Sequence, residues 1–69
     1  MVEELAIPDD LASALTAEPE AERNFAGFPV SARKEYLYWV VSARRSTTRQ
    51  ERIRKVVALA AKNQKSRYD

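Results

Sequence analysis

Basic side chains crowd one short stretch of this chain. Six of the thirteen residues from 43 to 55 are arginine or lysine, and Glu51 is the one acid among them. Cations at this density suit contacts with the phosphates of a nucleic acid or with the carboxylates of a protein. The stretch could form a helix-turn-helix with Arg49, Gln50 and Arg52 at the start of a recognition helix. The frequent turn glycine is missing, however, and the net charge of the chain is only +2. We therefore expect an acidic protein or peptide partner and keep nucleic-acid binding as the alternative.

Other chemistry is limited by the residue types that the sequence lacks. The chain has no cysteine, no histidine and a single glycine. It therefore offers no thiol nucleophile, no Ser-His pair, no histidine ligand for a metal and no glycine-rich phosphate loop. Asp9 and Asp10 are adjacent, so on a helix they diverge by about 100° and suit a helix start better than acid–base catalysis. We expect a protein without enzymatic activity, catalytic residues, cofactor or metal.

The elements that must position the basic residues are helices, because apolar residues recur at helical spacing and no segment alternates as a strand does. We expect one all-α domain over residues 1–69. It would be a small orthogonal or irregular bundle of three main helices, or four counting the break at Pro19. The expected helices cover residues 9–17, 19–26, 31–44 and 48–63, and a frayed tail covers 64–69.

Prolines and short polar residues indicate where these helices begin. Pro19 suits the first residue of a helix, because its missing N–H would have no partner there in any case. Thr48 and Glu51 have the spacing of a capping box, with Thr47 and Gln50 as an alternative one residue earlier. These signals predict the start of the last helix to within a residue.

The segment from 31 to 44 is the most apolar of the four. A helical wheel gathers its apolar residues on about half of the circumference; they are Tyr36, Leu37, Trp39, Val40, Val41 and Ala43. Tyr38 points away from this arc, so we expect its ring to be exposed. Arg44 and Arg45 come at the end of this helix, where cations stabilise the negative end of the helix dipole.

The basic residues of the last helix point to different sides of it. Its apolar residues recur at i, i+3, i+4 and i+7, as Ile53, Val56, Val57 and Ala60. Arg49 lies on the apolar side, one turn before Ile53, which favours an internal ion pair or a hydrogen-bonded anchor. Arg52 lies at the boundary of the apolar side, and Lys55 points outward.

Acids and bases are divided unevenly along the chain. Residues 1–32 hold seven acids and one base, whereas residues 33–69 hold eleven bases and three acids. Such asymmetry is typical of an interaction tail, or of an acidic first helix that folds over basic later helices. Glu35 is one of the three acids in the basic half. We expect it to form a salt bridge with an arginine of the last helix rather than to act in catalysis.

The amino-terminal residues bear on the location of the protein. Carboxylates stand where a signal peptide would have basic residues followed by an apolar run. No apolar stretch approaches the length of a membrane span. We therefore expect a cytoplasmic protein without membrane insertion.

The segment "ARKEYLYWVVSARRSTTRQERIRKVVALA" resembles the C-terminal helical domain of the bacteriocin-protection proteins, also called the YdeI or OmpD-associated family. The matching positions are Arg33, Lys34, Glu35, Tyr36, Leu37, Trp39, Ala43, Arg44, Arg45, Thr48, Arg49, Arg52, Ile53 and Lys55. Further matches precede them, at Pro8, Asp10, Leu11, Ala14, Leu15, Pro19, Ala21 and Phe25. The family commonly has Ser-Pro before the central helix, where this chain has Pro29 and Val30, so the usual serine cap is lost.

The resemblance implies an interaction module in bacterial self-protection or envelope stress, and in the family this domain often follows a larger N-terminal domain. It implies a basic and aromatic partner surface around Glu35, Trp39, Arg44, Arg45, Arg49, Arg52 and Lys55. The alternative is that about half of these side chains only hold the helices together. The identity of the partner and the oligomeric state are not predicted.

Overall fold

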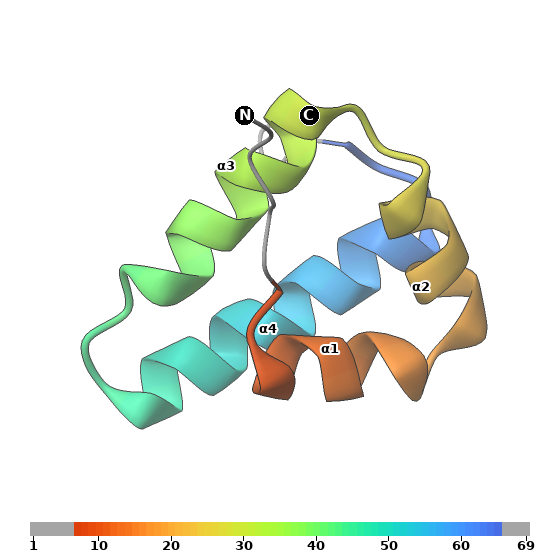
Figure 1. Cartoon of the computed structure of the whole chain (residues 1–69). Helices are drawn as coiled ribbons and strands as arrows, with labels where there is room; N and C mark the ends of the chain where they lie inside the picture. Colours follow the sequence, from red (N-terminus) through yellow and green to blue (C-terminus); the bar gives the residue numbers. More distant parts are fainter. Residues whose placement is uncertain (1–6, 66–69) are drawn as a thin grey trace.

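The computed structural model describes residues 7–65, which form four α-helices and no strand. The helices are α1 (Asp9–Thr16), α2 (Pro19–Ala26), α3 (Val30–Val41) and α4 (Ser46–Ala61). The Cα radius of gyration is 11.2 Å, close to the value of about 11 Å for a compact chain of this length. The predicted all-α class is confirmed. Figure 1 shows α4 passing through the middle of the molecule, with α3 on one side and α1 and α2 on the other.

The first two helices begin at residues that suit a helix start. Pro8 precedes α1, and Asp9 and Asp10 occupy its first turn, where the positive end of the helix dipole stabilises carboxylates. Pro19 is the first residue of α2. The observed bounds of α1 and α2 lie within one residue of the expected ones.

The third helix is shorter than expected at its carboxyl end. It ends at Val41 and not at residue 44. The hydroxyl of Ser42 donates a hydrogen bond of 2.9 Å to the backbone oxygen of Trp39, and Arg52 Nη1 donates one of 2.8 Å to the same oxygen. These bonds satisfy a carbonyl of the last turn without a further turn of helix.

The fourth helix begins two residues earlier than expected. Its N-cap is Arg45, which has an extended backbone, and no side chain caps the helix. Thr48 and Glu51 lie inside the helix, so the predicted capping box is wrong. The start of α3 also lacks a side-chain cap. Its N-cap is Pro29, which makes no side-chain hydrogen bond, where the family commonly has a serine.

The carboxyl end of α4 is a closed turn and not a frayed one. Asn63 has a φ of 61°, in the left-handed region that asparagine tolerates better than most residues. The N–H of Asn63 donates to the oxygen of Ala60 at 2.8 Å, and the N–H of Gln64 donates to the oxygen of Leu59 at 2.9 Å. These two bonds form a Schellman motif. The expected fraying is therefore wrong at residue 64, while residues 66–69 lie outside the described range.

Two long-range hydrogen bonds tie other helices to this turn. Asn24 Nδ2 of α2 donates to the oxygen of Ala60 at 2.8 Å, and the hydroxyl of Tyr36 of α3 donates to the oxygen of Gln64 at 3.0 Å. The ring of Tyr36 is fully buried, so its hydroxyl needs such a partner. The end of α4 thus fixes the positions of α2 and α3.

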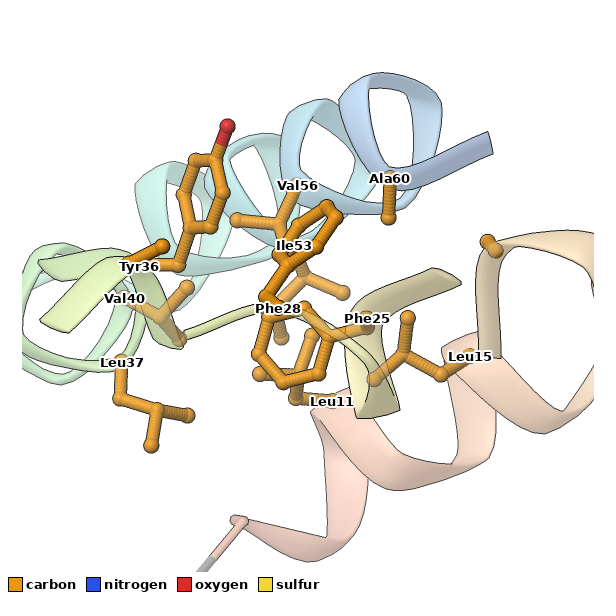
Figure 2. Packing of buried hydrophobic residues seen from close by; sticks show 12 residues of the cluster. Leu11, Leu15, Phe25, Phe28, Tyr36, Leu37, Val40, Ile53, Val56 and Ala60 are labelled. Atoms are coloured by element: carbon orange, nitrogen blue, oxygen red, sulfur yellow. The ribbon is translucent and has the colours of Figure 1, made fainter. Parts of the chain in front are cut away.

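The core is a single cluster to which all four helices contribute (Figure 2). It consists of Leu11, Leu15, Ala21, Phe25, Phe28, Ala32, Tyr36, Leu37, Val40, Ile53, Val56 and Ala60. The rings of Phe25, Phe28 and Tyr36 lie with centroids 5.6 to 6.3 Å apart in tilted pairs, a favourable arrangement for aromatic side chains. The exposed ring predicted at Tyr38 is confirmed. Val41, however, is 50% exposed, although the helical wheel placed it on the apolar arc.

No helix of the described range is long and apolar enough to cross a lipid bilayer.

Candidate functional site

A cleft of about 270 Å³ lies between α3 and the first half of α4. Trp39 of α3 forms one part of its lining, and α4 contributes Thr48, Glu51, Arg52 and Lys55. The four residues of α4 stand at i, i+3, i+4 and i+7, a spacing that places them on one face of a helix. The local helix alone therefore brings them together, and the packing of α3 against α4 adds the indole.

Arg52 is fixed in this cleft by three contacts. Its guanidinium carbon lies 5.3 Å from the centroid of the Trp39 ring, within the range of a cation–π interaction. Its Nη1 donates hydrogen bonds of 2.8 Å to the backbone oxygen of Trp39 and 3.0 Å to Ser42 Oγ. Arg52 thus closes the end of α3 and holds the indole in place. The same side chain is both a structural link and a wall of the cleft.

Three further cations lie in the cleft or in the connection that joins its two helices. Lys55 is an exposed lining residue, and Arg44 and Arg45 are exposed in the connection between α3 and α4. Within residues 7–65, none of the three forms a salt bridge. Glu51 stands four residues before Lys55 and lines the same cleft, but the two are not paired. These cations therefore carry positive charge that no contact within the described part of the chain neutralises.

Arg49 belongs to a different part of the surface. Its Nε donates to Asp10 Oδ2 at 2.7 Å, and its Nη2 donates to Asp10 Oδ1 at 3.3 Å. Through this hydrogen-bonded pair, the Arg49 guanidinium holds the pKa of the Asp10 carboxyl below its ordinary value of 3.8. The same contact raises the pKa of Arg49. The ion pair expected for Arg49 is present, but it lies at the surface, where it joins α4 to the first turn of α1.

Glu35 does not make the salt bridge that we predicted. In the described range it pairs with no arginine of α4. It is partly buried and stands four residues before Trp39, so it occupies the same side of α3 one turn away. It does not line the cleft. The prediction failed because it rested on the small number of acids in the basic half of the chain, which does not determine whether an arginine lies within reach of Glu35.

The structure therefore divides the predicted site residues into three groups. Trp39, Arg52 and Lys55 meet in one cleft, Arg44 and Arg45 are exposed in the connection between α3 and α4, and Arg49 and Glu35 do not line the cleft. Sequence reasoning missed three side chains: Thr48 and Glu51 of the cleft and Ser42 behind Arg52. The spacing of Thr48, Glu51, Arg52 and Lys55 on one helical face could have identified the first two.

No group of three acidic or other metal-ligating side chains that could hold a metal ion is found among residues 7–65.

One comparison with known proteins gives a match. The model of a family described as "Bacteriocin-protection, YdeI or OmpD-Associated" matches residues 4–63 of the 69. The matched range includes the cleft and all four helices. No curated protein and no solved structure matches the chain significantly.

Replacing Arg49 by methionine tests the pair with Asp10. The pKa of Asp10 is lowered in the folded protein, so the pair stabilises the fold fully above the ordinary value of 3.8 and loses its effect as the pH falls through the lower folded value. We expect NMR titration of the Asp10 carboxyl to give a higher pKa in Arg49→Met than in the unmodified protein. The stability difference between the two proteins should shrink at acid pH. Arg54→Met, which removes an exposed charge of the same helix, should leave the pKa of Asp10 nearly unchanged, and an equal rise there would contradict the assignment.

Replacing Arg52 by methionine tests its role at the end of α3. The variant keeps the aliphatic stem but removes two hydrogen bonds, while Ser42 still donates to the Trp39 oxygen. We expect the free energy of unfolding to fall by about 1 kcal/mol. The matched variant Lys55→Met should change it by less than about 0.5 kcal/mol. Urea unfolding measures both, and equal effects would show that Arg52 is not a structural link.

Proposed function

This chain belongs to the bacteriocin-protection, YdeI or OmpD-associated family, and we propose that it is a non-enzymatic interaction module that binds an acidic protein or peptide. In this proposal the module serves bacterial protection against bacteriocins or antimicrobial peptides, and it works in the cytoplasm. Family membership supports the biological role. The cleft between α3 and α4 supports the mode of binding.

The observation that carries the proposal is the combination of an indole with unpaired cations around one small cleft. Trp39, Arg52 and the exposed Lys55 line it, and Arg44 and Arg45 are exposed in the connection between its two helices. Tryptophan and arginine are the residue types most often responsible for affinity at protein interfaces. Positive charge on a rim attracts acidic partners and raises the rate of association.

The size of the cleft favours one side chain of a partner over a whole small molecule. A volume of about 270 Å³ lies just below the usual range of about 300 to 1,000 Å³ for ligand pockets. An apolar side chain of the partner would pack on the Trp39 ring, and neighbouring carboxylates would face Lys55 and the two arginines of the connection. Arg52 is already fixed by its bonds to Trp39 and Ser42, so little side-chain entropy is lost there on binding.

Two contacts make nucleic-acid binding the weaker candidate. A helix-turn-helix would use Arg49, Gln50 and Arg52 to reach bases or phosphates. In the structure, Arg49 is engaged by Asp10 and Arg52 by the end of α3. Of the three, Gln50 alone is left exposed without a contact of this kind.

The intrinsic fluorescence of Trp39 gives a direct test, because it is the only tryptophan of the chain. We expect an acidic peptide with one leucine or phenylalanine to change this fluorescence in a saturable manner. Reversal of the rim charge in Lys55→Glu should weaken binding by about tenfold, equivalent to about 1.4 kcal/mol. Arg54→Glu makes the same change of charge one residue away and does not line the cleft, so it should have a much smaller effect.

Two results would contradict the proposal. One is that Lys55→Glu and Arg54→Glu weaken peptide binding equally, which would mean that binding depends only on the net charge of the protein and not on the cleft. The other is binding to random duplex DNA that exceeds peptide binding and weakens steeply with salt, since that dependence marks phosphate contacts.

A further inference from the structure

A line of exposed apolar residues follows the side of α3 that faces away from the core. Val30 is 53% exposed, Tyr38 is 62% exposed and Val41 is 50% exposed. Together with Lys34 they stand at i, i+4, i+8 and i+11, which places all four on one side of the helix. We call these four residues the outer stripe. At 1.5 Å per residue it is about 16 Å long.

The fold itself gives no reason for this stripe. The core takes Tyr36 and Val40 from the other side of α3 and Leu37 from the edge of the stripe, so the apolar residues of α3 extend beyond the part of the helix that the core covers. Figure 1 shows α3 at the edge of the molecule, with α4 along one side of it. Exposed apolar groups in a row, in contrast to scattered ones, are typical of an interaction surface.

Charge decides between two ways of covering the stripe. Lys34 lies within it, and Arg44 and Arg45 follow its carboxyl end. In the described range none of these cations forms a salt bridge. A second copy of the chain packed stripe to stripe would bring these like charges together, which disfavours that complex. A partner with carboxylates beside its apolar residues would neutralise them.

The surface of α3 also favours a helical partner. Its backbone N–H and C=O groups are bonded within the helix, so an extended strand would find no free edge to pair with. A second helix can instead pack its apolar side chains between those of the stripe.

We propose that the outer stripe binds an amphipathic acidic helix of the partner. The helix would place apolar residues at i, i+3 or i+4, and i+7 against Val30, Tyr38 and Val41, with carboxylates beside Lys34 and Arg44. Tyr38 directly precedes Trp39 of the cleft, so the chain leaving such a helix reaches the cleft as well. This inference rests on the proposed function and specifies the conformation and the second contact surface of the same partner.

Two synthetic peptides of equal composition test it. Both carry leucines at helical spacing among glutamates, but one has prolines at its ends and the other has them in the middle, where they prevent a helix. Fluorescence anisotropy of the labelled peptides measures their affinities for the full chain. We expect the helix-forming peptide to bind at least about tenfold more tightly.

The double variant Tyr38→Gln, Val41→Gln should abolish this preference for the helical peptide, and circular dichroism would show that it remains folded. Ala58→Gln, an exposed change on α4, is the matched control and should keep the preference. Equal affinities of the two peptides for the unmodified chain would overturn the inference and leave the proposed function standing. Failure of both peptides to bind would overturn the proposed function too. A dimer that forms through the stripe and is lost in the double variant would also overturn the inference, because a second copy would then be the occupant.

Discussion

The other three helices are held by α4, each through a bond at a different level along its length. Near its start, Arg49 binds Asp10 of α1. One turn later, Arg52 binds the last turn of α3, and at its far end the Ala60 oxygen accepts a hydrogen bond from Asn24 of α2. A domain of this size has a small core and no disulfide, so such directional bonds are needed to specify how the helices are arranged. Apolar burial supplies most of the driving force, but it does not by itself specify that arrangement.

The same bonds determine which basic residues are left for a partner. Arg49 and Arg52 bond to other helices of the same chain. Lys55, Arg44 and Arg45 are exposed and form no salt bridge within residues 7–65. The basic stretch therefore offers a partner fewer cations than its sequence contains. Arg52 connects the two roles, since the contact that ends α3 also holds the indole of Trp39 at the edge of the cleft. Structure and recognition are therefore coupled at this one side chain.

The helices and the ends of α1 and α2 could be predicted from the sequence, whereas the end of α3 and both ends of α4 could not. Pro19 marks the start of α2, and apolar spacing predicted core residues such as Tyr36, Val40 and Ile53. The end of α3 depends on a contact with another helix, because Arg52 of α4 bonds to its last turn, whereas α4 is closed by the left-handed Asn63 just beyond it.

The site was predictable to a similar degree. Helical spacing could place Arg52 and Lys55 relative to one another. Their proximity to Trp39 depends on how α3 packs against α4. The wheel likewise placed Val41 with the core, because a wheel gives directions around a helix and not the neighbours that it meets. Glu35 shows the limit of counting charges. Few acids lie in the basic half of the chain, yet Glu35 forms no salt bridge with any residue of the described range.

In the proposed binding mode, an acidic partner meets this protein at the cleft between α3 and α4. Chemical-shift mapping by NMR with an acidic peptide tests it most directly. We expect the largest changes at the Trp39 indole N–H and at the backbone amides of Thr48, Arg52 and Lys55, with little change in α1 and α2. Changes centred on α1 and α2, or no change at the indole, would contradict it.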